Sequence, residues 1–164
     1  MAKLTSDVLD EQEDADVCLL QFRLFGQRRA VEGRIRTVLC FEDNALLKSM
    51  LANPTAGEVL VIDGGGSIQT ALMGDMIATS ALGNGWAGVV VNGAIRDSAQ
   101  IDAMDIHVKA IATNPRKSAK HGKGECDVAI EFGGVRFVPG DYLYSDEDGL
   151  VVVRKLKSQA NSAK

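Results

Sequence analysis

The chain has 164 residues, enough for one domain with its own hydrophobic core but short for two, so we expect residues 1–164 to form a single domain. Hydrophobic residues make up 46% and charged residues 24%, which is typical of a globular α/β protein and excludes a mainly disordered chain. The net charge of −4 disfavours a surface that neutralises phosphates, so no direct nucleic-acid binding is expected.

Membrane insertion and disulfide cross-linking are not expected either. The N-terminus leads into an acidic stretch without the apolar run of a signal peptide, and no later apolar segment reaches the roughly 18 residues of a transmembrane helix. Cys18, Cys40 and Cys126 are widely spaced and show no paired pattern of a zinc or redox site. We therefore expect a soluble, cytoplasmic protein with reduced cysteines.

The N-terminal third of the chain predicts a helix or arm, then a strand and a helix. Residues 10–16 are acidic, and the apolar residues after them predict a helix or arm laid on the body. Residues 35–41 are rich in β-branched and aromatic side chains, which predicts a strand. Asp43 and Asn44 offer N-cap chemistry for a helix over residues 45–51.

The middle of the chain predicts two buried parallel strands with a helix between them. Residues 59–62 and 87–91 are short apolar runs, typical of strands covered on both faces. A glycine turn, residues 63–67, follows the first run, and residues 83–85 end the helix. The apolar residues at helical spacing are Ile68, Ala71, Leu72 and Met76. This order predicts a right-handed crossover.

The last third of the chain turns to β-structure. A polar stretch over residues 92–104 predicts a short helix, and residues 106–112 predict a strand. Residues 128–138 predict a hairpin that turns at two glycines, and residues 149–153 predict the last strand. Residues from about 156 are small, polar and basic, so we expect them to fray.

Two glycine-containing segments could bind an anion. Backbone N–H groups of the turn at residues 63–67 would meet a helix start, although a tight turn capped by Ser67 explains the same residues. This turn lacks the lysine of a P-loop and does not fit G-x-G-x-x-G. Gly74 interrupts a helical pattern, either for close packing on a strand or to expose N–H groups to a carboxylate.

Arg96 and Asp97 follow a buried strand, where ligand sites of open α/β sheets tend to lie. A carboxylate can hold Mg²⁺ with waters completing its coordination, and a guanidinium can bind a substrate carboxylate bidentately. On composition alone, a surface ion pair or a helix cap remains the alternative.

Three other polar groups receive structural interpretations. The basic segment over residues 116–123 lacks interleaved aromatics, so a solvated loop is favoured over an RNA-binding loop. His107 is expected on a strand face, and the two histidines, His107 and His121, do not predict a zinc site. Residues 146–149 predict a hairpin turn rather than a calcium loop.

Five motifs in fixed order resemble the RraA-like family. They are residues 41–44 (FEDN), 61–67 (VIDGGGS), 85–88 (GWAG), 92–97 (NGAIRD) and 144–149 (YSDEDG). The likeness extends from Phe22 to Val153. This family includes 4-hydroxy-4-methyl-2-oxoglutarate aldolases, which are also oxaloacetate decarboxylases, and the regulator of ribonuclease E activity. Some members were once labelled demethylmenaquinone methyltransferases.

The resemblance implies a fold, an assembly and a set of site residues. The fold would be a swivelling β/β/α domain with a central parallel strand-helix-strand unit and a C-terminal β hairpin. Assembly would be a ring-shaped homotrimer, or a hexamer, with sites at subunit interfaces. Asp97 would bind a divalent metal cation (Mg²⁺ or Mn²⁺), and Asp75 would orient metal-bound water. The residues that would bind the 2-keto acid substrate are Gly74, Asp75, Met76, Ile77 and Arg96.

The implied activity is that of a metal-dependent carbon–carbon lyase with Arg96, Asp97 and Asp75 as catalytic residues. Cleaving 4-hydroxy-4-methyl-2-oxoglutarate and decarboxylating oxaloacetate leave the same pyruvate enolate, so one site could serve both reactions. Larger aldolases of the family add an acidic residue from a longer C-terminal region of a neighbouring subunit, and the likeness does not extend to that region.

Two other functions are open. A non-enzymatic regulator would bind ribonuclease E or its helicase partner and inhibit RNA processing, but the family's regulator lacks the Asp after the Arg. A methyltransferase comes third, because Asn92 stands where an acidic residue would bind the adenosine ribose.

Overall fold

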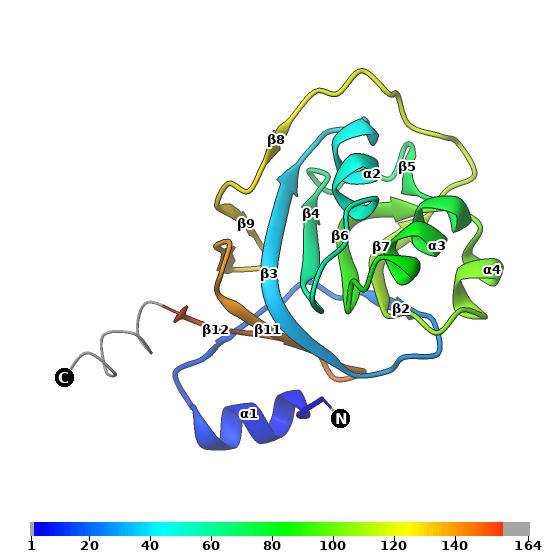
Figure 1. The fold of residues 1–164 in the computed structure, drawn as a ribbon. Helices are drawn as coiled ribbons and strands as arrows, with labels where there is room; N and C mark the ends of the chain where they lie inside the picture. The colour runs from blue at the N-terminus through cyan, green and yellow to red at the C-terminus, as the bar shows by residue number, and fades with distance from the viewer. Residues whose placement is uncertain (1, 156–164) are drawn as a thin grey trace.

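The computed structural model describes residues 2–155 as one curved sheet with three helices on one face, a separate N-terminal helix, and a β hairpin beyond the sheet (Figure 1). The N-terminal helix is α1 (Thr5–Glu11), and the helices on the sheet are α2 (Ala45–Leu51), α3 (Asp75–Gly83) and α4 (Ser98–Asp102). The strands are β1 (Asp16–Val17), β2 (Arg23–Phe25), β3 (Val31–Leu39), β4 (Val59–Asp63), β5 (Ala71–Met73), β6 (Gly88–Ile95), β7 (Val108–Thr113), β8 (Glu125–Cys126), β9 (Ile130–Phe132), β10 (Val135–Phe137), β11 (Tyr142–Ser145) and β12 (Leu150–Val153). This mixed α/β architecture matches the predicted fold class.

Strand β4 shows why the centre of the sheet is stable. Val59 and Val61 point into one hydrophobic cluster, with the C-terminal strands, while Leu60 and Ile62 point into another, with α2, α3 and α4. All four side chains are fully buried, which explains the continuous apolar run of this strand. Strands β3, β4, β6 and β7 pair in parallel, so the predicted parallel unit is confirmed.

Strand β3 joins two kinds of pairing. Its first residues pair antiparallel with β11, and its last residues pair parallel with β4. Strands β11, β12 and β1 therefore continue the main sheet beyond β3 (Figure 1). The hairpin predicted over residues 128–138 is present as β9 and β10, which form a separate two-stranded sheet.

The prediction of a helix directly after the glycine turn is wrong. Ala71, Leu72 and Met73 form strand β5, which pairs in parallel with β6, and the helix begins only at Asp75. These residues are buried because they add a strand beside β6, not because they line one helix face. Ser67 consequently caps no helix.

Other element boundaries also differ from prediction. Strand β6 continues through Asn92 to Ile95 with every residue buried, so the polar stretch expected from residue 92 begins only at Arg96, and its predicted short helix is α4. Strand β11 was not predicted, and β3 begins at Val31 because its first half pairs with β11. The tail expected to fray from about residue 156 lies outside the described residues. Within residues 2–155, no helix has the length and apolar character needed to span a bilayer.

Candidate active site

One pocket brings together every residue predicted for the site. It has a volume of about 260 Å³ and lies between α2, the N-terminus of α3 and the end of β6. The predicted residues that line it are Gly74, Asp75, Met76, Ile77, Arg96 and Asp97. Their roles stay predictions, but their convergence on one hollow makes this pocket the candidate active site.

The end of β6 places Asp97 at the pocket. The Arg96 N–H donates to Met73 O at 2.9 Å, which fixes the chain beside β5. Asp97 then adopts a left-handed conformation with φ 56°, which costs most residues free energy but is tolerated by Asp. Asp97 precedes α4 without capping it through its side chain, and its Oδ2 instead accepts the Asp75 N–H at 3.1 Å. This conformation thus turns the carboxylate toward α3.

Gly74 is required by the close approach of the two chain segments. A Cβ atom at this position would lie 2.7 Å from Asp97 Oδ2 and 3.3 Å from Arg96 Cγ. Its φ of −120° is accessible to any residue, so the requirement is steric rather than conformational. Of the two explanations offered for this glycine, close packing occurs, but against the side chains of Arg96 and Asp97 and not on a strand as predicted.

The N-terminus of α3 adds hydrogen-bond donors to the pocket. Its first N–H, of Asp75, binds Asp97, while those of Met76 and Ile77 have no intrahelical acceptor. The positive end of the helix dipole reinforces these donors toward an anion. Within the described residues, the Arg96 guanidinium makes no hydrogen bond or ion pair. The pocket thus combines donors and a cation suited to a carboxylate.

The carboxylates fit a hard divalent cation better than zinc. No group of three His, Cys, Asp or Glu side chains in residues 2–155 could hold a metal ion by itself. Mg²⁺ commonly uses only one or two protein carboxylates and keeps several waters, so a single carboxylate such as that of Asp97 could serve as its protein ligand. Its Oδ2 receives the Asp75 N–H and its Oδ1 has no protein partner, which leaves one oxygen for a cation.

The glycine turn at residues 63–67 is not an anion site. The Gly65 N–H donates to Asp63 Oδ1 at 2.9 Å, and the N–H groups of Gly64 and Gly66 both donate to Asn92 O. These donors are therefore used within the protein. The alternative of a tight turn is correct, although Ser67 donates its hydroxyl to Glu42 at 2.6 Å instead of capping a helix.

Three lysines also line the pocket and were not predicted. Lys48 comes from α2, and Lys117 and Lys120 come from the basic segment, residues 116–123. Apart from the buried Ser118, the side chains of this segment are exposed, as predicted for a solvated loop, but its position beside the pocket was not predicted. No local pattern places these lysines at the pocket, because they meet it only through tertiary folding.

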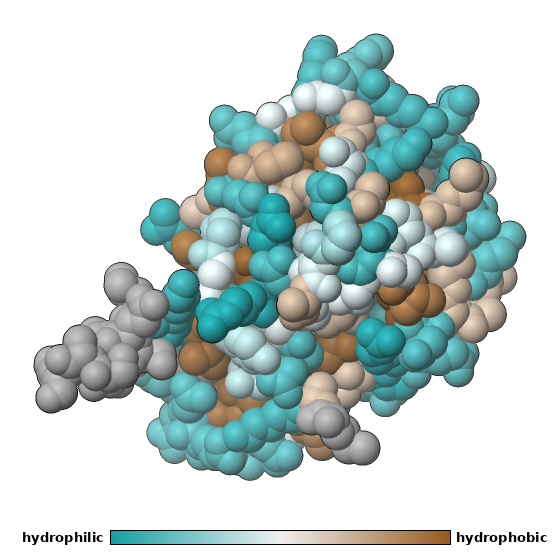
Figure 2. Space-filling view, viewed as in Figure 1, coloured by the Kyte–Doolittle hydropathy of each residue, from teal (hydrophilic) through white to brown (hydrophobic). Residues whose placement is uncertain are grey.

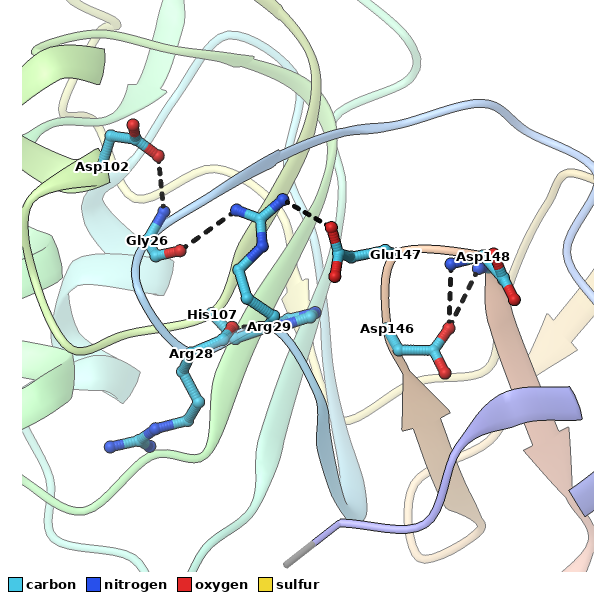
Figure 3. Close-up of polar contacts among 9 residues, drawn as sticks. Gly26, Arg28, Arg29, Asp102, His107, Asp146, Glu147 and Asp148 are labelled. Atoms are coloured by element: carbon cyan, nitrogen blue, oxygen red, sulfur yellow. Dashed lines mark hydrogen bonds and ion pairs between the residues drawn. The ribbon is translucent and has the colours of Figure 1, made fainter. Parts of the chain in front are cut away.

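The histidine interpreted as structural lies in a separate polar cluster (Figure 3). His107 is fully buried just before β7, with Nδ1 at 2.8 Å from Arg28 O and Nε2 at 2.8 Å from Ser145 Oγ. Burial lowers the pKa of His107 to about 4, so the ring is neutral at pH 7. The ring therefore links β11 to the segment that precedes β3, and it does not line the pocket.

The turn between β11 and β12 is held by Asp146 (Figure 3). Its Oδ1 accepts the N–H of Asp148 at 3.0 Å and that of Gly149 at 3.3 Å. Thr5 donates its N–H and its hydroxyl to the same carboxylate, both at 2.8 Å, which attaches α1. The predicted hairpin turn is confirmed. The cysteines Cys18, Cys40 and Cys126 are free thiols.

In the view of Figure 2, hydrophilic residues cover much of the surface, and the apolar areas between them are separate. Exposed apolar side chains include Met76, at the mouth of the pocket, with an exposed fraction of 82%.

Comparisons with known proteins agree with the fold and the motif order. The model of the RraA-like family, described as Aldolase/RraA, matches residues 5–152. A Geobacillus kaustophilus HTA426 protein named S-adenosylmethionine:2-dimethylmenaquinone methyltransferase is 49% identical with a TM-score of 0.91, over 93% of this chain and 96% of that one. The RNA-processing inhibitor RraA from Thermus thermophilis is 45% identical with a TM-score of 0.90, over 93% of each chain. Streptomyces coelicolor RraAS2, named an unusual member of the RNase ES inhibitor RraA protein family, is 31% identical with a TM-score of 0.74, over 96% of this chain and 82% of that one.

Proposed function

Because the chain belongs to the RraA-like family, which includes ribonuclease inhibitors and aldolases, we propose that it is a divalent-metal-dependent carbon–carbon lyase. Its substrates would be 4-hydroxy-4-methyl-2-oxoglutarate, cleaved to pyruvate, and oxaloacetate, decarboxylated to pyruvate. The observation that supports this most is the hydrogen bond from the Asp75 N–H to Asp97 Oδ2 beside the unpaired Arg96. This arrangement supports the proposal, because Asp97 would then bind the metal beside N–H groups and a guanidinium that would receive a substrate carboxylate.

The chain's own residues would bind and orient the 2-keto acid. Arg96 and the N–H groups of Met76 and Ile77 would receive its carboxylate through charge-assisted hydrogen bonds. Asp97 would hold Mg²⁺ or Mn²⁺ through Oδ1. A divalent cation bound there would supply Lewis-acid stabilisation of negative charge on the keto oxygen.

Both reactions produce the pyruvate enolate, so one site would serve both. Breaking the C3–C4 bond of the aldol or of oxaloacetate leaves its electron pair on C3 as the pyruvate enolate. In aldol cleavage the 4-hydroxyl proton is also lost, and in both reactions C3 then takes up a proton. Asp75 lines the pocket beside Asp97, where its carboxylate would orient the water that carries these protons.

The test is pyruvate release from oxaloacetate by purified protein with Mg²⁺, with a chelator and with Asp97→Ala. We expect release that needs the metal and that Asp97→Ala abolishes. The matched control is Asp105→Ala, which removes an exposed carboxylate outside the pocket and should leave release unchanged. Release no faster than that of the metal alone would contradict the proposal.

Assembly as a homotrimer with sites at subunit boundaries forms part of this proposal. It follows from the resemblance to the RraA-like family, and in such an assembly a neighbouring subunit would cover Met76, which is 82% exposed at the pocket. Light scattering coupled to size-exclusion chromatography measures the mass directly, and a monomer would contradict this part.

A second candidate function, favoured by the 45% identity to the Thermus RNA-processing inhibitor, is binding and inhibition of a ribonuclease E-type enzyme. This function would use the outer surface and would not need the metal-binding carboxylate. Inhibition of RNA cleavage that persists in Asp97→Ala, together with no pyruvate release, would establish it in place of the lyase.

Methyl transfer, which the name of the Geobacillus relative suggests, is not proposed. Asn92 is buried, and its side-chain amide donates to Asp63 Oδ1 at 3.1 Å. This residue therefore supports the glycine turn, and it is not an acidic group available to a ribose.

A further inference from the structure

We propose that the pocket has a second anion-binding end, formed by Lys48 and Lys120 beside Asn44, which binds the second carboxylate that both proposed substrates carry. This inference rests on the proposed function, because Arg96 and the N-terminus of α3 are taken as the end that binds the first carboxylate.

The charges that line the pocket do not cancel. Lys48, Arg96, Lys117 and Lys120 give four cations against the two carboxylates of Asp75 and Asp97, although the whole chain has a net charge of −4. Within the described part of the chain, none of these four cations makes an ion pair or hydrogen bond through its side chain. One cation at Asp97 and one ligand carboxylate at Arg96 would still leave the lysines without counter-charge.

The lysines lie toward one end of the pocket. Lys48 and Lys120 also line an adjoining hollow against Ala45, Ser49 and Ala52 of the α2 region, and neither Arg96 nor Asp97 reaches that hollow. The two lysines therefore mark the α2 side, while Arg96 and Asp97 mark the α3 side. A ligand that spans the pocket would meet a cationic group at each end.

Asn44 gives an independent indication that a ligand belongs there. Its Oδ1 is the single buried side-chain nitrogen or oxygen in residues 2–155 that has no hydrogen-bond partner, and the residue is 7% exposed. Asn44 lines the same pocket as the lysines. A buried acceptor without a donor is unfavourable, and a ligand hydroxyl such as the 4-hydroxyl of the aldol would supply the donor.

Asp43 acts as the positioning residue for Lys120. Its carboxylate accepts the N–H groups of His121 at 2.8 Å, Gly122 at 3.2 Å and Lys123 at 3.4 Å. Burial alone would raise the pKa of Asp43, but these hydrogen bonds lower it below its ordinary value, so the group is charged at neutral pH. The carboxylate thereby fixes the chain directly after Lys120.

Hydrogen bonds to backbone oxygens hold residues 118 and 119 of the basic segment. The Asn44 N–H donates to Ala119 O at 3.0 Å, and the Ser118 hydroxyl donates to Ala71 O at 2.8 Å. Figure 1 shows this stretch after β7 arching past α2 and β5 on its way to β8. The exposed segment is thus fastened along the pocket, which allows Lys120 to act at a defined place.

The experiment compares two ligands by isothermal titration calorimetry in buffer with Mg²⁺. They are 2-oxoglutarate and 2-oxopentanoate, which share the 2-keto acid end and differ only in a carboxylate or a methyl group at the other. Neither can lose CO₂ or an aldol fragment to give pyruvate. Because a charge-assisted hydrogen bond changes affinity by roughly tenfold or more, we expect 2-oxoglutarate to bind about tenfold more tightly.

Substitutions then show which residues cause the tighter binding of 2-oxoglutarate. Lys120→Met should remove most of it by weakening 2-oxoglutarate alone, Lys120→Arg should retain it, and Lys123→Met, which changes a lysine outside the pocket, should have no effect. Asp43→Asn should reduce the preference if it folds, as circular dichroism will show. An unchanged preference in a folded Asp43→Asn would overturn the positioning role.

The outcomes separate this inference from the lyase proposal. Equal affinities for the two ligands in the unmodified protein, or equal weakening of both by Lys120→Met, would overturn the second anion site even if pyruvate is released. A preference that depends on Lys120 without pyruvate release would support the site and contradict the lyase. Binding of neither ligand would overturn both.

Discussion

Replacing Gly74 by alanine tests the geometry of the site directly. The added methyl group would stand 2.7 Å from Asp97 Oδ2, at least about half an ångström inside ordinary van der Waals contact. Asp97 or the start of α3 must move by that amount, which breaks the 3.1 Å hydrogen bond from the Asp75 N–H, worth about 1 kcal/mol. Misplacement of catalytic groups by 0.5 to 1 Å lowers rates by roughly tenfold to a hundredfold.

We therefore expect Gly74→Ala to slow metal-dependent pyruvate release by that factor and to weaken Mn²⁺ binding measured by electron paramagnetic resonance. The matched control is Gly83→Ala at the other end of the same helix, where an added Cβ meets no atom within 4 Å. This control should keep full activity and raise the free energy of unfolding by about 0.5 kcal/mol. Unchanged Mn²⁺ affinity and activity in Gly74→Ala would refute the steric argument.

Three further predictions concern stability. Burial lowers the pKa of His107 to about 4, so below pH 6.5 the unfolded chain binds a proton that the folded chain excludes. The free energy of unfolding should therefore fall by roughly 3 kcal/mol between pH 6.5 and 4. His107→Gln should flatten this pH dependence in urea titrations. Burial would raise the pKa of Asp146, but hydrogen bonds from Thr5 and the following turn lower it. The contribution of Asp146 to stability is therefore present above its unfolded pKa and lost as pH falls through its folded pKa. Asp146→Asn should destabilise the protein by about 2 kcal/mol at pH 7 and by less in acid. Trp86→Phe should cost about 2 kcal/mol in thermal unfolding, since the buried indole donates to Asn53 O at 3.1 Å; no change would contradict that role.

The parts of the fold that were predictable depend on local signals. The apolar run at residues 59–62 is buried on both faces, and the helix over residues 45–51 has its expected bounds. Strand β5 was missed because a three-residue buried strand carries no period that separates it from one turn of helix. Strand β11 was missed because its partner, the first half of β3, is distant in the chain.

The site residues likewise divide into those that local patterns predicted and those that depend on tertiary structure. Arg96 and Asp97 were found because they follow a strand within a motif, and Gly74 because glycine is unusual in a helical pattern. Lys120 and Asn44 were noted only in a basic segment and at a helix start, and neither was assigned to the site, because their meeting depends on the path of the chain after β7. The left-handed conformation of Asp97, which directs its carboxylate to α3, was likewise invisible in the residue order.

The way the basic segment is fastened has a consequence for protein engineering. Its anchors are backbone groups, the Ser118 hydroxyl and the Asp43 carboxylate, whereas the side chains of Lys117 and Lys120 support no part of the fold. Changing these two side chains should therefore alter which ligands are accepted while leaving folding intact. The segment is a natural place to diversify in a library, because variation there is separated from the residues that make the scaffold.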